Sequence, residues 1–134
     1  MKKMEKIKVA LKNYKSIKMI IGFYFNGYFR EVGWINSFEK KMPIGVNGEE
    51  IPWITYSAIE FLKDRLNSTM EIFEYGSGNS TIYYSTKVKS VIAIEHDREW
   101  YEKIKLNLLE NAKIFYKNLE YNGEYCRMIN EFEN

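Results

Sequence analysis

The stretch "FEYGSGNST", residues 73–81, places two glycines in a G-x-G arrangement shortly after an acidic residue. It continues a short apolar run at residues 70–75 that is typical of a buried strand. The small polar residues that follow favour a turn and the start of a helix. Glycine adopts positive φ without steric cost and allows a ligand to approach the backbone closely. The stretch therefore predicts a strand, a tight loop and a helix that together could bind a ligand.

Helices and strands alternate on both sides of this loop. Thr55 and Asp97 are good N-caps for helices before and after it, and a further helix is expected over residues 80–86. Apolar runs predict strands at residues 70–75, 88–95 and 113–117. Strands joined by helical crossovers form a parallel sheet. The fold class is therefore α/β, a Rossmann-like parallel sheet with flanking helices that is incomplete at about three strands.

The chain before residue 51 has a different character. Ile7, Leu11, Tyr14, Ile17 and Ile21 recur at intervals of three and four residues, which predicts a helix near the start. Residues 31–54 are rich in glycine and proline and predict irregular chain. We therefore expect a helical and irregular segment over residues 1–50 and a partial Rossmann-like domain over residues 51–134.

Charge is unevenly distributed along the 134 residues. Residues 1–18 hold seven lysines against Glu5 alone, a net charge of +6, whereas the whole chain has a net charge of +2. Without a broad basic region we expect no nucleic-acid partner. The lysine-rich start is compatible with contact to an anionic membrane surface, although a solvated helix face is the simpler interpretation.

Other composition features exclude some kinds of site. The longest apolar run near the N-terminus, residues 19–25, is too short for a transmembrane segment, which needs about 20 residues. Cys126 is the only cysteine and His96 the only histidine, so an internal disulfide is excluded and we expect no metal site. A cytoplasmic location is the expectation.

An acidic residue at the end of the second predicted strand indicates which kind of ligand the loop could bind. Glu95 lies 19 residues after Gly76, and in doubly wound folds an acid near that distance accepts hydrogen bonds from ribose hydroxyls. Ligands bind beyond the carboxyl ends of such strands. A ribose-containing cofactor is therefore expected, although a surface acid is the alternative for Glu95.

Two cofactor classes contain a ribose and compete for this loop. A dinucleotide site has a third glycine in G-x-G-x-x-G, but that position is Thr81 here. Glu74 would also oppose a nearby pyrophosphate, whereas it suits a ligand with a positive amino group. S-adenosylmethionine, which has a ribose, an amino-acid end and no phosphate, fits better than a nicotinamide dinucleotide.

Residues 70–97, "MEIFEYGSGNSTIYYSTKVKSVIAIEHD", resemble the cofactor-binding half of the class I S-adenosylmethionine-dependent methyltransferases. The piece E-Y-G-S-G looks like the first motif of that family and Glu95 looks like its second. The family pattern often has a third glycine where this chain has Ser80. The segment "IPWITYSAIEFL", residues 51–62, also looks like the segment that precedes the first strand in some of these enzymes.

The resemblance implies a role for each matching residue. Glu74 would face the methionine amino group, and the backbone of Tyr75, Gly76, Ser77 and Gly78 would lie under the cofactor. Glu95 would bind the ribose and His96 would lie beside the adenine. Thr55 and Tyr56 are weaker candidates for covering the methionine end. No residue is identified as a catalytic base.

The resemblance also implies a larger fold than this chain can form. The class I fold has seven strands, and only 16 residues follow Asn118, room for a turn at residues 122–123 and a short helix. The first strand would then be an open edge, which invites pairing with a second copy in a homodimer. The expected function is an S-adenosylmethionine-dependent methyltransferase, or a truncated part of one, with a small-molecule acceptor. The alternative is a non-catalytic binding or protein-interaction module that keeps half of the fold.

Overall fold

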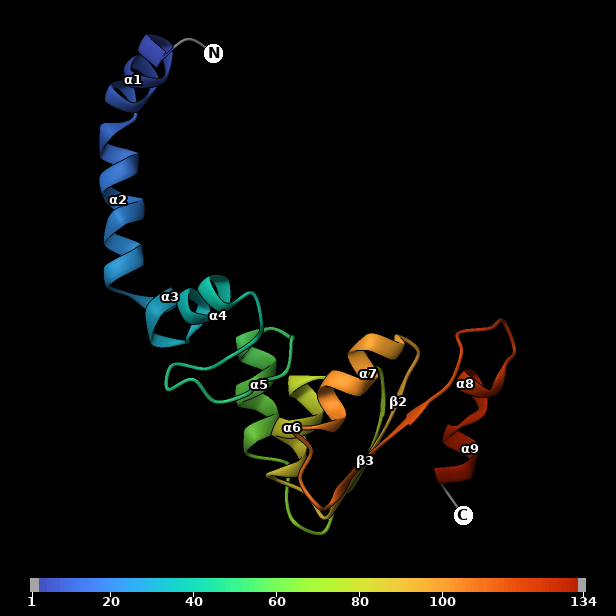
Figure 1. Ribbon diagram of the computed structural model, residues 1–134. Coiled ribbons are helices and arrows are strands. Elements are labelled where there is room, and N and C mark those ends of the chain that lie inside the picture. The colour runs from blue at the N-terminus through green and yellow to red at the C-terminus, as the bar shows by residue number, and fades with distance from the viewer. Residues whose placement is uncertain (1–2, 133–134) are drawn as a thin grey trace. The chain divides into compact units, whose positions relative to one another are not determined.

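The computed structural model of the chain describes residues 3–132, which divide into two compact units at Glu49 and Glu50. The first unit contains the helices α1 (Lys3–Lys12), α2 (Tyr14–Phe25), α3 (Tyr28–Glu31) and α4 (Trp34–Lys40) (Figure 1). The helical start is therefore confirmed. The described residues of the apolar stripe, Ile7, Tyr14, Ile17 and Ile21, are all exposed.

The irregular segment begins later than the sequence predicts, because α4 occupies residues 34–40. Lys41 ends this helix with a left-handed backbone conformation, at φ 55°. The Ser37 hydroxyl then accepts a hydrogen bond from the Ile44 amide and donates one to the Ile44 carbonyl. The glycines and prolines that predicted irregular chain lie mainly after this point, so their effect starts at residue 41 and not at residue 31.

The second unit has the predicted alternation of helices and strands. Its elements are α5 (Tyr56–Lys63), β1 (Glu71–Tyr75), α6 (Asn79–Ser85), β2 (Ser90–Glu95), α7 (Arg98–Lys105), β3 (Ala112–Tyr116), α8 (Glu124–Arg127) and α9 (Ile129–Phe132). The three strands form one sheet in the order β1-β2-β3, with both pairs parallel. The incomplete Rossmann-like sheet with flanking helices is therefore confirmed.

Local signals in the sequence account for two helix starts. The Thr55 hydroxyl accepts a hydrogen bond from the Ala58 amide at 3.3 Å at the start of α5. The Asp97 carboxylate accepts one from the Trp100 amide at 2.9 Å at the start of α7. The Asp97 cap satisfies the Trp100 amide, one of the amides that a helix start leaves without a helical partner. The Ala58 amide also donates to the Thr55 carbonyl at 2.9 Å. These caps fix where α5 and α7 begin, and α7 begins shortly after β2 ends at Glu95.

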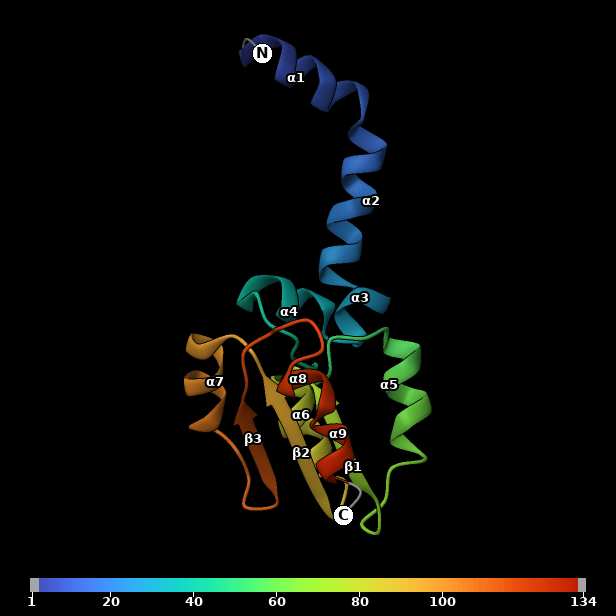
Figure 2. The same cartoon turned by 90° about the vertical axis from the view of Figure 1, so that its right-hand side faces the viewer.

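The core of the second unit is centred on β2. Val91, Ala93 and Ile94 have no exposed surface, as expected for a middle strand covered on both faces. Helices α5, α6 and α7 lie on one face of the sheet and α8 and α9 on the other (Figures 1 and 2). The sheet is therefore a central layer between two layers of helix.

The C-terminal residues form the second helical layer. Asn122 adopts φ 55° in the turn before α8, where the sequence predicts a turn and a short helix. The rings of Phe73 and Phe132 lie 5.6 Å apart, and the Tyr75 hydroxyl donates a hydrogen bond to the Cys126 carbonyl at 2.9 Å. These contacts hold the end of the described chain against β1.

Strand β1 lies at the edge of the sheet, as the sequence predicts. Among the described strands its neighbour is β2 alone. A hollow of about 350 Å³ lies beside it, lined by Leu62, Leu66, Ile72, Phe73, Glu74, Tyr75 and Tyr84. Pairing of this edge with a second copy stays a prediction.

Candidate functional site

The loop after β1 is anchored to β2 through the backbone. Gly76 has φ +86°, a conformation that costs a residue with a side chain roughly 1–2 kcal/mol. Its amide donates to the Ile94 carbonyl at 2.8 Å. Nothing lies within 4 Å of the position that a Cβ atom would take. Gly76 is therefore required by the backbone turn and not by crowding.

Ser77 is held from two sides. Its amide and its hydroxyl both donate to Glu95 Oε2, each at 2.9 Å. Its carbonyl accepts a hydrogen bond from Trp100 Nε1 at 2.7 Å. Trp100 thus connects the loop to α7, a role that the sequence pattern did not reveal because this tryptophan fits equally well into the apolar stripe of a helix.

Glu95 is the centre of this arrangement. Its side chain lies at the end of β2, and the residue is 4% exposed. While Oε2 is bound by Ser77, Oε1 accepts hydrogen bonds from the His96 amide at 2.8 Å and the Asp97 amide at 2.9 Å. A carboxylate has about four acceptor sites, so all of them are in use. The acid predicted to bind ribose therefore ties the β1 loop to the start of α7 in this structure.

Glu74 performs a similar task at the start of α6. One of its oxygens accepts a hydrogen bond from the Ser80 hydroxyl, and the other accepts one from the Thr81 hydroxyl at 2.7 Å. Burial raises the pKa of Glu74 and the charge of Glu95 adds to the rise, while the two hydroxyl hydrogen bonds oppose it. Glu74 thus lies beside the loop, and its two oxygens are engaged by α6.

The amides of the loop have partners inside the protein. The Gly76 amide is bound by Ile94, the Ser77 amide by Glu95, and the Gly78 amide donates to Thr81 Oγ1 at 3.1 Å. A pyrophosphate needs free amides of this kind. The loop therefore offers no donor from residues 76–78 to a phosphate, and Glu74 places negative charge beside it.

Gly78 differs from Gly76 in what it requires. Its φ of 165° is extended backbone that any residue adopts. A Cβ atom there would meet the Trp100 ring at 3.8 Å, an ordinary van der Waals contact. The fold therefore does not need glycine at this position.

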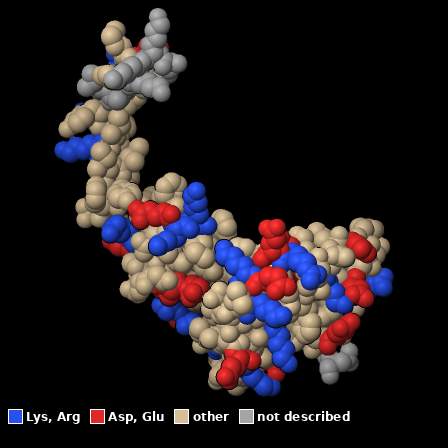
Figure 3. Space-filling model, in the orientation of Figure 1, with Lys and Arg blue, Asp and Glu red and all other residues tan. Residues whose placement is uncertain are grey.

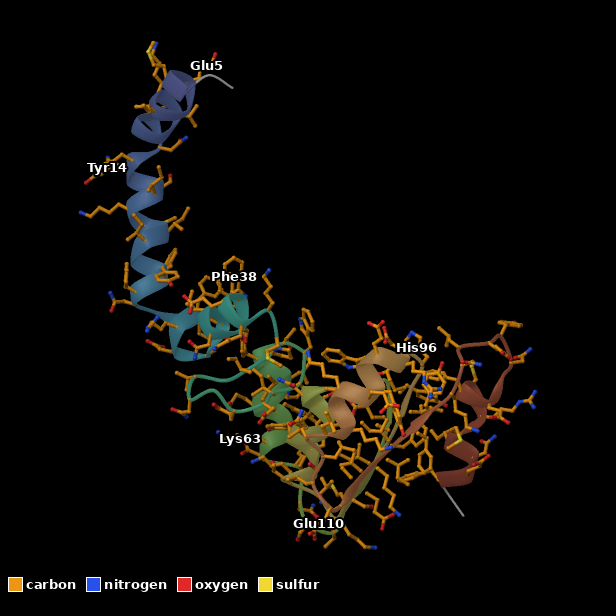
Figure 4. The ribbon with its side chains drawn as sticks, viewed as in Figure 1. Glu5, Tyr14, Phe38, Lys63, His96 and Glu110 are labelled. Carbon is orange, nitrogen blue, oxygen red and sulfur yellow. The ribbon has the colours of Figure 1, made fainter. Side chains whose placement is uncertain are left out.

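His96 and Tyr125 border the same end of the sheet. His96 is labelled in Figure 4, on the side of the sheet toward α8, and 48% of its side chain is exposed. Its Nδ1 lies 3.2 Å from Glu95 Oε1, and its ring centre lies 5.8 Å from that of Tyr125. The ring of Tyr125 is also 5.5 Å from that of Tyr75. Tyr125 therefore spans the site from β1 to His96.

Tyr125 is a site residue that the sequence did not identify. Burial raises the pKa of its hydroxyl and Glu95 adds to the rise, while a backbone hydrogen bond from Gly76 lowers it. The residue lies in α8, about 50 residues from the loop that it contacts. No spacing rule connects the two, so nothing in the sequence pattern pointed to this contact.

The structure thus brings Glu74, Tyr75, Gly76, Ser77, Gly78, Glu95 and His96 together at the carboxyl ends of β1 and β2. Thr55 and Tyr56 have structural partners, since Thr55 caps α5 and Tyr56 packs against the core formed by Ile51, Ile59 and Tyr83. Whether any of these residues contacts a cofactor stays a prediction.

Comparison with known proteins gives one informative similarity. No protein-family profile matches the chain. Over 97 residues the chain is 30% identical to the 23S rRNA (uracil(1939)-C(5))-methyltransferase RlmD of Vibrio vulnificus (strain CMCP6). The match covers 69% of this chain and 22% of that protein. The similarity supports a relationship to methyltransferases and does not extend to most of that enzyme.

Proposed function

We propose that the chain binds S-adenosylmethionine at the carboxyl ends of β1 and β2, as a class I methyltransferase or a part of one. The observation that carries the proposal is the loop at residues 76–78. It has the strand-loop-helix setting of a nucleotide site, yet its three amides are used inside the protein. Such a loop suits a cofactor that has a ribose but no phosphate.

The two acids suit the two ends of this cofactor in charge and in kind. Glu95 is a buried acceptor at the end of β2, where ribose hydroxyls would replace the Ser77 hydroxyl as donors. Glu74 is a carboxylate with a raised pKa, and the positive amino group of the methionine end would favour its ionised form. The cofactor would supply the methyl group, and these residues would bind and orient it.

The position of Tyr125 restricts the space in which a cofactor could bind. Its ring lies against Tyr75 and His96, above the loop. A cofactor at this place would have to move α8 or share the space with the Tyr125 ring. This contact favours the alternative function, a binding or interaction module without catalysis, and therefore the test must separate binding from transfer.

The proposed acceptor is a small molecule. The relative named above acts on rRNA, but residues 50–134 of this chain carry ten Lys and Arg against fourteen Asp and Glu. A net charge of −4 on the unit that holds the site opposes binding to a phosphate backbone. A cytoplasmic location is part of the same proposal.

Calorimetric titration of the 134-residue chain with S-adenosylhomocysteine, with NAD as the control ligand, tests the cofactor. Binding of the first ligand alone is expected. Equal binding of both, or binding of neither by a folded chain, would contradict the proposal. Ser77→Ala is the informative variant, because it removes a competing donor from Glu95 and keeps the Ser77 amide in place. Affinity should be unchanged or higher.

Transfer of a labelled methyl group tests the acceptor and the activity. Label in a small-molecule product would support the proposed acceptor. Label in RNA would contradict it and would indicate an RNA acceptor, as the name of the relative states for that enzyme. Binding without transfer to either fraction would favour the non-catalytic module.

A further inference from the structure

The first unit carries a basic region followed directly by an apolar one. Residues 1–18 have the net charge of +6 described above, and α2 contains no acidic residue. No residue of α2 is buried. Its large apolar side chains are between 36% and 62% exposed, namely Tyr14, Ile17, Met19, Ile20, Ile21, Phe23, Tyr24 and Phe25.

The two kinds of side chain occupy different sides of α2. Lys15, Lys18 and Gly22 follow one another at intervals of three and four residues, so they share one side of the helix. Ile17, Ile20 and Tyr24 follow one another at the same intervals and share the side of the helix opposite Lys15. Figure 3 shows the surface of α2 as mostly uncharged with basic side chains beside it, and in Figure 4 the labelled Tyr14 extends away from the helix. The helix is therefore amphipathic with a wide apolar side.

Aromatic residues extend this apolar surface into α3 and α4. The ring of Phe23 is 6.3 Å from that of Phe29, Phe29 is 5.2 Å from Trp34, and Trp34 is 5.4 Å from Phe38. All four side chains are more than 40% exposed. Trp and Phe are common on the apolar side of helices that lie along a membrane surface.

We propose that α1 and α2 dock on the surface of an anionic lipid bilayer, with lysines at the headgroups and the apolar side of α2 in the interface. Charge complementarity selects this occupant. A nucleic acid would satisfy the lysines but leave the apolar side chains in water, and a second copy would bring a like charge of +6 against the first. A bilayer satisfies both surfaces at once. This inference does not depend on the proposed function.

The length of α2 decides how it would lie. Its 12 residues extend over about 18 Å, whereas the hydrocarbon core of a bilayer is about 30 Å thick. Among residues 3–132, no helix has the combination of length and apolar character that crossing a bilayer demands. The helix therefore lies along the surface.

Co-sedimentation of the full chain with lipid vesicles tests the proposal. We expect binding to phosphatidylcholine mixed with phosphatidylglycerol, much weaker binding to phosphatidylcholine alone, and weakening by salt. A lysine near an anionic surface contributes about five-fold to the partition coefficient. The triple variant K12Q/K15Q/K18Q should therefore bind on the order of 100-fold more weakly.

Two further variants show whether both surfaces are used. The triple variant K63Q/K105Q/K113Q has the same net charge, removes exposed lysines of the second unit, and should bind like the parent chain. The pair I20S/F25S removes two of the most exposed apolar side chains of α2 and should lower binding while all charges are kept. Circular dichroism of each variant checks that the helices persist.

Four outcomes would overturn the proposal. The first is equal binding to the two vesicle compositions, and the second is equal loss of binding in the two triple variants. The third is a stable oligomer without lipid that I20S/F25S dissociates, since it would assign this surface to a second copy. Binding to RNA with no binding to vesicles would likewise assign the lysines to another partner.

Discussion

Replacing Glu95 by Gln measures how much this buried acid contributes to the stability of the fold. The substitution keeps the size of the side chain but turns one acceptor oxygen into an amide that only donates. The amide would be directed at Ser77, because the Ser77 hydroxyl can rotate and accept a hydrogen bond. The opposite orientation is worse, because His96 and Asp97 present backbone amides that cannot accept.

The expected cost follows from these contacts. The Ser77 amide loses its acceptor, and an unsatisfied buried donor costs about 1–3 kcal/mol. The remaining hydrogen bonds lose the assistance of a charge, which is roughly half of their strength. Relief from burying a negative charge offsets part of the loss. The free energy of unfolding should therefore fall by about 2–4 kcal/mol.

Urea unfolding followed by circular dichroism measures this difference. Glu99→Gln is the matched control, because Glu99 is an exposed acid in the first turn of α7 and its loss should cost at most about 1 kcal/mol. Equal destabilisation of the two variants would refute the reasoning, because Glu95 would then not hold the loop. The expected destabilisation also makes Glu95→Ala a poor test of ribose binding, because this substitution would disrupt the loop as well as the proposed contact.

Three other expectations concern the same site. Gly76→Ala should lower the free energy of unfolding by about 1–2 kcal/mol because of the positive φ, whereas Gly78→Ala should change it by less than about 0.5 kcal/mol; equal effects in urea unfolding would contradict this difference. Burial raises the pKa of Glu74, so its contribution to stability is fully present below the unfolded-state pKa and is lost as pH rises through the folded-state pKa. Glu74→Gln should remove that decline from a plot of unfolding free energy against pH, and an unchanged slope would show that another group causes it. Tyr125→Ala should raise the affinity for S-adenosylhomocysteine in a calorimetric titration, because it clears the space above the loop; a lower affinity would make Tyr125 part of the binding site.

The alternation of strands and helices was predictable because it depends on local patterns. The caps at Thr55 and Asp97 and the apolar runs of the three strands each lie within a few residues of the feature that they specify. The position of Glu95 at a strand end followed from the same patterns. These are short-range preferences of the backbone, and one sequence is enough to recognise them.

The hydrogen bonds and ring contacts within the site were not predictable in the same way. Three features depend on contacts between distant parts of the chain. All acceptor sites of Glu95 are hydrogen-bonded, Trp100 donates to the Ser77 carbonyl, and Tyr125 lies above the loop. An acidic residue at the end of a strand has the same sequence signature whether it is free or fully bonded. The helix α4 was missed for a different reason, because the glycines and prolines beyond it dominated the window.

The edge position of β1 has a consequence for the order in which the molecule comes apart on heating. Half of the site is carried by a strand that has one hydrogen-bonded neighbour among the described strands, while Glu95 belongs to the middle strand of the sheet. Edge elements open locally at a lower free energy than the whole domain. On heating, the site should therefore unfold at a lower temperature than the rest of the sheet. A ligand that bridges β1 and β2 would bring the two unfolding temperatures together.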